Sequence, residues 1–194
     1  KAISDDGLAV KGHLDTQQAI EAFQFFQDLF VKWKVSPQAP IPDMLETGLA
    51  ASKVGGDATF GNVALYYPDF PLGVMPLPYF QTPLSHIGSL HYCLSTKGKN
   101  HEAAAKLIKF MGGPEASLIM YNHLGQLPAS KWVYSQIDDY DTYPRKIMLD
   151  TLLSWGEVRP KTPGYLEYEQ VINTTLKNLM LGGNVDQLVP QMAN

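Results

Sequence analysis

Residues 88–111 read GSLHYCLSTKGKNHEAAAKLIKFM, and this stretch decides the fold class. Its first half, Ser89 to Leu94, is short and contains residue types that favour a strand. Asn100 is suited to cap the helix that we expect from His101 to Met111. The predicted buried face of that helix consists of Ala103, Ala104, Leu107, Ile108 and Met111. A strand followed by an amphipathic helix predicts an α/β arrangement.

The chain before this stretch predicts one long helix and two more strands. Between Asp15 and Trp33, apolar residues recur at spacings of three and four, as on one face of a helix. Asp15 with Gln18 resembles a capping box at its start. Strand candidates are Leu49 to Val54 and Leu72 to Pro78, the second of which is ended by its prolines.

The chain after this stretch predicts mostly helix. We expect helices over residues 114–122, 130–136, 144–155 and 164–181, and a last one from Asn184 onward. Short strands among long helices give the fold class α/β. Three or four strands are too few for a self-contained sheet under this many helices, and an incomplete sheet leaves unpaired edges. We therefore expect an N-terminal part of the same protein, outside this sequence, to supply further strands.

The composition of the chain argues against several kinds of binding partner and bound group. The net charge is -4 and the basic residues are scattered, so no basic stripe indicates nucleic acid. No apolar run approaches the roughly 20 residues of a membrane helix, and no signal peptide is recognisable. Cys93 is the only cysteine, so no intrachain disulfide can form. The histidines show no metal-ligand spacing, and we expect no metal and no cofactor.

Several motifs follow one another in the order found in one known family. Residues 47–56 read TGLAASKVGG, residues 72–78 read LGVMPLP, and residues 99–104 read KNHEAA. Residues 127–130 read LPAS, and residues 159–165 read RPKTPGY. None of these motifs is specific alone, but their order is. Together they resemble the later part of the family 1 extracellular solute-binding proteins, the maltose-binding-protein-like sugar receptors of ABC importers.

That resemblance implies a two-lobed, periplasmic-binding-protein-like type II fold, of which this chain supplies the later part. Residues 1–85 would form the first part of the second lobe. Residues 86–128 would be a crossing segment that completes the first lobe, and residues 129–194 would add the final helices of the second lobe. The lobes would close around a ligand by hinge motion.

The resemblance also implies a function and a location. The protein would capture a mono- or oligosaccharide in the cleft between the lobes and deliver it to the permease subunits of an ABC importer. It would lie in the periplasm or outside the cell, anchored by a lipid at an N-terminus outside this sequence.

Two candidate ligand-binding residues follow the glycine turn at residues 55–56. Sugar sites combine aromatic walls, which stack on the apolar faces of the ring, with a few fixed polar groups. Asp57 would accept bonds from sugar hydroxyls and Phe60 would form a wall, although many relatives carry a tryptophan in this region. A turn aspartate and a core phenylalanine are the alternative interpretation.

Four more candidate ligand-binding residues lie on the predicted crossing strand and at the start of a predicted helix. Gly88, Ser89 and His91 lie on the predicted crossing strand, where the backbone would approach the ligand; hinge geometry alone is the alternative. Tyr165 follows a proline-glycine turn at a predicted helix start and would stack on the sugar. Its alternative role is that of a partly buried structural tyrosine.

Two other classes of function stay open. A glycoside-acting enzyme needs two carboxylates that face each other across the scissile bond. Asp138, Asp139 and Asp141 share one loop instead, and Glu167 and Glu169 point apart on one helix. We therefore expect a binding protein with no catalytic residue. A sensor, or another non-transport binding module on the same fold, would show the same motifs.

Overall fold

The computed structural model describes residues 2–193 and divides the chain into two compact units. The first unit combines the segment up to Pro42 with the segment from Arg159 onward, and the second is Asp43–Val158. These boundaries differ from the predicted lobe boundaries at residues 85 and 128. The lobe assignment therefore stays a prediction. Both helices and strands are present, in agreement with the α/β class.

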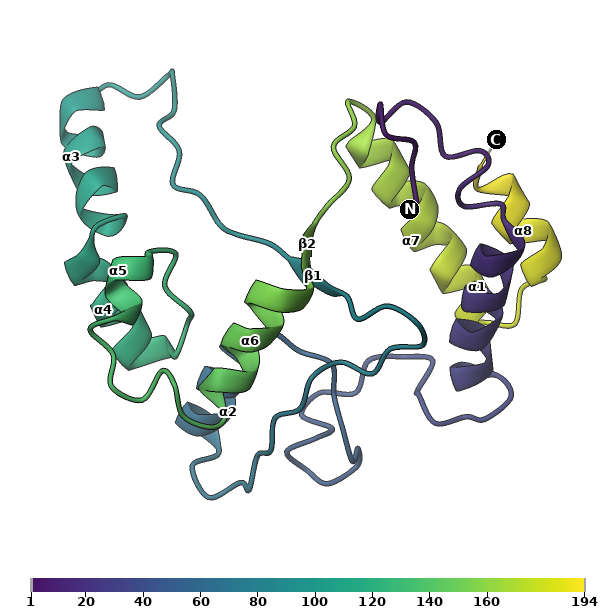
Figure 1. The fold of residues 1–194 in the computed structure, drawn as a ribbon, viewed down its shortest axis with the longest axis horizontal. Helices are drawn as coiled ribbons and strands as arrows, with labels where there is room; N and C mark the ends of the chain where they lie inside the picture. The colour runs from purple at the N-terminus through teal and green to yellow at the C-terminus, as the bar shows by residue number, and fades with distance from the viewer. Residues whose placement is uncertain (1, 194) are drawn as a thin grey trace. The chain divides into compact units, whose positions relative to one another are not determined.

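The first unit is built from three helices. These are α1 (Gln17–Phe30), α7 (Tyr165–Met180) and α8 (Val185–Gln191), which pack on one another (Figure 1). The core between them consists of Leu14, Leu179, Val185, Val189 and Met192. The side-chain amide of Gln27 on α1 donates to the backbone carbonyls of Leu179, at 3.1 Å, and of Gly183, at 2.6 Å. This amide ties α1 to the C-terminal end of α7.

The start of α1 differs in detail from the prediction. Thr16, not Asp15, is the N-cap residue, and its hydroxyl oxygen accepts a hydrogen bond from the backbone N–H of Ala19. Asp15 instead accepts a hydrogen bond from the backbone N–H of Gly12 in the preceding turn. Asp15 and Thr16 are both residue types that cap helices. Because Asp15 is bonded within the preceding turn, Thr16 is the residue that caps α1.

The second unit contains the remaining elements. They are α2 (Asp57–Tyr66), β1 (Ser85–Ile87), α3 (His101–Met111), α4 (Pro114–Leu124), α5 (Lys131–Tyr134), α6 (Arg145–Trp155) and β2 (Gly156–Val158). The helices predicted over 101–111, 114–122, 130–136 and 144–155 correspond to α3, α4, α5 and α6 within a few residues. Helix α2 was not predicted, because glycines lie before it and inside it.

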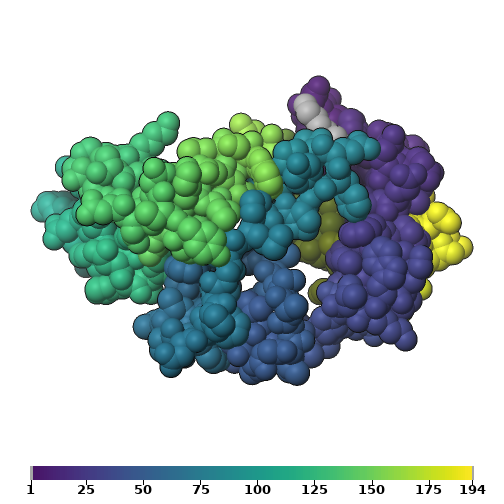
Figure 2. Space-filling model, turned by 60° about the horizontal axis from the view of Figure 1, so that its bottom comes forward, coloured from purple at the N-terminus to yellow at the C-terminus, as the bar shows by residue number. Residues whose placement is uncertain are grey.

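The two strands pair with each other in parallel. Ser85 lies opposite Gly156, and Ile87 lies opposite Val158. A Cβ on Gly156 would meet the backbone carbonyl oxygen of Leu152, which cannot swing aside as a side chain can, so a larger residue here would force the backbone to shift. In Figure 2 the teal chain near residue 85 lies against the green chain near residue 155. The pair joins two segments that are distant in sequence.

The three strand predictions were wrong. Residues 49–54, 72–78 and 89–94 form no strand within the described chain, and the only strand near the third lies just before it. A strand needs a hydrogen-bonded partner, which local sequence does not supply. Apolar side chains of these segments are exposed: Leu49, Val54, Met75, Leu90, Tyr92 and Leu94. Across residues 2–193, none of the helices has the length and apolarity that a membrane crossing requires.

Candidate functional site

Asp57 and Phe60 lie in the first turn of α2, and both are half-buried. The Asp57 carboxylate accepts two backbone hydrogen bonds. One comes from Ala58 in the same turn, at 2.9 Å, and the other from Leu127, at 2.7 Å. The second bond joins segments 70 residues apart in sequence. This carboxylate therefore fixes the start of α2 to the loop after α4.

The backbone of α2 touches the end of α4 without an intervening side chain. A Cβ on Gly61 would lie 1.9 Å from the carbonyl oxygen of Leu124, a distance that no real side chain tolerates. Gly125 ends α4 in the left-handed conformation, with φ of 64°. We call the contact formed by Asp57, Gly61, Leu124 and Leu127 the α2–α4 joint.

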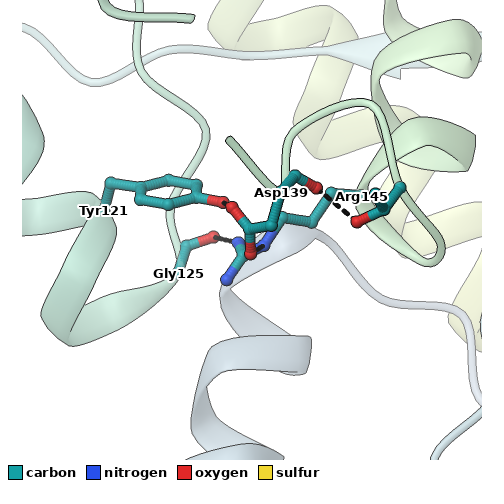
Figure 3. Close-up of polar contacts among 5 residues, drawn as sticks. Tyr121, Gly125, Asp139 and Arg145 are labelled. Carbon is teal, nitrogen blue, oxygen red and sulfur yellow. Dashed lines mark hydrogen bonds and ion pairs between the residues drawn. The ribbon is translucent and has the colours of Figure 1, made fainter. Parts of the chain in front are cut away.

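Arg145, the first residue of α6, lies beside this joint and contacts several groups at once (Figure 3). Its Nε donates to a carboxylate oxygen of Asp139 at 3.0 Å, and its Nη1 donates to the Gly125 carbonyl at 3.5 Å. Its guanidinium lies over the Tyr121 ring, 4.3 Å from the centroid, and 5.7 Å from that of Phe60. Only 16% of its side chain is exposed. A planar, permanently charged group suits this combination of stacking and donation.

Tyr121 and Asp139 complete the arrangement around Arg145. The Tyr121 hydroxyl donates to Asp139 at 2.5 Å. Burial raises the pKa of Tyr121 far above its usual value, and the bond to Asp139 adds to this. Burial also acts to raise the pKa of Asp139, but the Tyr121 hydroxyl and the Arg145 charge outweigh it and lower that pKa. At neutral pH the tyrosine stays protonated and the aspartate stays ionised, so this cluster holds structure in place.

Gly88, Ser89 and His91 lie in an exposed segment without regular secondary structure. The Ser89 hydroxyl and the His91 Nε2 are 3.0 Å apart and form a hydrogen bond with each other. Cys93, two residues further on, is also exposed. The segment therefore presents a hydroxyl and an imidazole to their surroundings, two groups that exchange hydrogen bonds with polar ligands.

Tyr165 lies in the other unit, as the first residue of α7, and is half-buried. Its hydroxyl donates to Glu169 at 3.2 Å, and the same carboxylate pairs with Arg159 at 3.5 Å. The Arg159 guanidinium lies 5.7 Å from the centroid of the Tyr165 ring. The neighbouring Tyr168 has a raised pKa because of its burial. The ring of Tyr165 is thus held by its own helix.

The structure brings some of the predicted residues together. Asp57 and Phe60 share one turn of α2, and Ser89 and His91 are hydrogen-bonded. Sequence reasoning missed Arg145, whose partners come from distant segments and leave no local pattern. Glu169, by contrast, follows Tyr165 at the spacing of one helical turn, which the sequence displays. In the described part of the chain, no three or more His, Cys, Asp or Glu residues cluster in a way that could hold a metal.

Solved structures show the same fold. A solute-binding protein of an ABC transporter from Thermotoga lettingae, bound with alpha-D-tagatose, matches with a TM-score of 0.90 and 23% identity. A maltose/maltodextrin-binding domain from Bdellovibrio bacteriovorus, bound to maltotriose, matches 98% of this chain with a TM-score of 0.79 and 23% identity. Maltose-bound MalE3 from T. maritima matches with a TM-score of 0.74 and 22% identity.

The matches cover nearly all of this chain but only about half of each solved chain. This chain is covered completely by the first and third structures, yet it spans only about half of each solved chain, 51%, 51% and 52% respectively. The solved proteins have a two-lobed, periplasmic-binding-protein-like architecture. The chain thus has the fold of part of such a molecule.

A comparison with protein families gives the same answer by an independent route. Residues 1–146 match the family described as bacterial extracellular solute-binding protein. This range is most of the chain, and it includes all the motifs up to residue 130 on which the sequence resemblance rests. The chain belongs to the bacterial extracellular solute-binding proteins.

Proposed function

We propose that this chain is part of a receptor that binds a sugar or oligosaccharide between two lobes and delivers it to an ABC importer. The observation that carries the proposal is the match to the tagatose-bound solute-binding protein, with a TM-score of 0.90 over the whole chain. The titles of two further matches name maltotriose and maltose.

The side chains of the predicted site agree with this chemistry. Neutral sugars are bound by hydroxyl, imidazole and carboxylate groups together with aromatic rings. Ser89 and His91 offer the first two, and Tyr165 offers a ring whose orientation its own helix fixes. Asp57 and Phe60 offer a carboxylate and a ring on α2, and Gly88 allows a close backbone approach. We propose these six residues as ligand contacts.

The lobe assignment belongs to the same proposal. Residues 86–128 would complete the first lobe, and residues 1–85 and 129–194 would belong to the second. Leu90, Tyr92 and Leu94 occupy every second position of the segment after β1, and exposed fractions of 97%, 52% and 45% leave them without a packed surface in the described chain. Such alternation is typical of a strand with one apolar face. It supports a further part of the protein that pairs with this segment.

The family supports a location, and it motivates a proposal about partners. An extracellular family implies a periplasmic or extracellular location. We further propose attachment to the membrane surface through a lipid, and permease subunits of an importer as partners. Closure around the sugar would be the state that those subunits recognise, because a ligand that contacts both lobes stabilises the closed form.

A thermal-shift screen tests the proposal. The full-length protein is heated with D-tagatose, maltose or maltotriose, and with amino acids and short peptides as controls. A ligand that binds only the folded state raises the melting temperature by mass action. A shift with a sugar is expected, and a shift with only amino acids or peptides would contradict the sugar assignment. Chromatography of the recovered oligosaccharide separates the classes of function, since a binding protein returns it intact and a glycoside-acting enzyme does not.

A further inference from the structure

Arg145 is connected to both of the α2 residues that we propose as ligand contacts. Its guanidinium lies 5.7 Å from the centroid of the Phe60 ring. Its Nη1 donates to the Gly125 carbonyl, two residues before Leu127, whose N–H is bonded to the Asp57 carboxylate. We infer that Arg145 is a positioning residue, which fixes Phe60 and Asp57 for contact with the sugar. This inference rests on the proposed function, because it requires these two residues to contact the ligand.

Helix α2 has few contacts of its own to hold it in place. Val63 is its only buried residue, and its N-cap residue, Gly56, makes no capping hydrogen bond through a side chain. Elements with few buried apolar contacts fluctuate at low free-energy cost. Phe60 lies in the first turn of this helix, so the position of its ring depends on contacts from outside the helix.

Arg145 is itself fixed by several partners in the same compact unit (Figure 3). Only 16% of its side chain is exposed, and its Nε donates to Asp139 at 3.0 Å. Its guanidinium lies 4.3 Å from the centroid of Tyr121, whose hydroxyl donates to the same aspartate. A side chain that is locked by such partners can hold its neighbours in the exact geometry that a binding site needs. Because these partners occupy most of the group, Arg145 supports the site from behind and does not contact the ligand.

The hydrogen bonds that hold Asp57 leave it able to bind a sugar. Its two carboxylate oxygens each accept one backbone hydrogen bond, from Ala58 and from Leu127. Each oxygen has two lone pairs, so each can accept a further bond from a sugar hydroxyl. The α2–α4 joint therefore positions this carboxylate and leaves acceptor capacity for a ligand.

Two variants of the full-length protein test the inference. Arg145→Met removes the charge and the planar group, whereas Arg145→Lys keeps the charge and loses only the planar group. Lys146→Met is the matched control. It removes a positive charge from the next residue, whose ion pairs are with Asp141 and Asp150.

A fluorine probe reports the position of the Phe60 ring without any ligand. 4-Fluorophenylalanine is incorporated at residue 60 and, in a separate sample, at Phe26 in the first unit, and ¹⁹F NMR spectra are recorded well below the melting temperature. The signal from residue 60 is expected to shift and broaden in Arg145→Met, to change less in Arg145→Lys, and to stay unchanged in Lys146→Met. The signal from Phe26 should be the same in every variant, which separates local release of the ring from unfolding. An unchanged signal from residue 60 in both Arg145 variants would overturn the inference.

Calorimetry with D-tagatose, maltose and maltotriose in turn measures the consequence for binding. For a sugar that binds the wild type, Arg145→Met is expected to bind about tenfold more weakly, because each side chain that must be ordered on binding lowers affinity about two- to tenfold. This effect should shrink in a Phe60→Leu background, because Arg145 acts through that ring.

The two readouts separate the inference from the proposed function. Unchanged affinity in Arg145→Met, or an effect of the same size with and without the Phe60 ring, would overturn the positioning role even if the variant melts earlier. If no sugar binds the wild type, the proposed function fails, and the fluorine signal at residue 60 alone decides whether Arg145 fixes the ring.

Discussion

Replacing Leu179 by alanine is expected to destabilise the first unit strongly. Leu179 has an exposed fraction of 0% and packs in the core with Leu14, Val185, Val189 and Met192. The substitution removes three carbon atoms, worth about 2.4 kcal/mol at about 0.8 kcal/mol for each buried CH₂ group. The cavity left behind adds to this loss, and Leu→Ala changes in cores cost about 2–5 kcal/mol. We therefore expect a decrease of about 3–4 kcal/mol in the free energy of unfolding.

Urea unfolding of the full-length protein, followed by circular dichroism, measures this quantity. The matched control is Leu181→Ala, two residues later, where 72% of the side chain is exposed. Exposed substitutions usually change stability by less than about 0.5 kcal/mol. A loss below about 1 kcal/mol for Leu179→Ala, or an equal loss in the control, would show that this cluster is not the core of the unit.

Three further predictions concern the site and the helix ends. Tyr165→Ala is expected to weaken sugar binding by about 1–3 kcal/mol in calorimetry, because the ring is lost; Tyr165→Phe should retain most of the affinity, and unchanged affinity in the alanine variant would remove Tyr165 from the site. The pKa of Asp139 is lowered in the folded state, so the ionised carboxylate stabilises the fold. This stabilisation is complete when the pH is well above the ordinary pKa of 3.8, and it is lost as the pH falls through the lower pKa of the folded state. Urea unfolding of wild type and Asp139→Asn should therefore differ at pH 7 and converge in acid, and a gap that stays constant with pH would contradict this. Thr16→Ala should cost about 1 kcal/mol through the lost cap of α1, whereas Gln17→Ala, at an exposed position, should cost little in the same assay.

Local patterns predicted the helices well. The apolar periodicity of α1 and the helical stretches that became α7 and α8 depend on residues within one or two turns of each other, so the sequence displays them directly. The N-cap of α1 was misassigned by one residue, because Asp15 and Thr16 both fit the role and only the preceding turn decides between them.

Long-range contacts explain what the sequence did not predict. The strand pair joins residue 85 to residue 156, and no local pattern indicates that partner. Helix α2 is held by a hydrogen bond from residue 57 to residue 127, and its Gly61 reads as a helix breaker unless the neighbouring Leu124 carbonyl is known. Arg145 was overlooked for the same reason, since its partners at residues 121, 125 and 139 come together only in the folded chain.

The exposed thiol of Cys93 has a practical use. It is the only sulfur nucleophile of this chain and lies two residues from His91, in the segment that we propose to contact the sugar. A thiol-reactive fluorophore would attach there at a single position, without engineering of other cysteines in this sequence. Its emission would respond to changes in the polarity of the surroundings, so the labelled protein would serve as an optical reporter of ligand concentration.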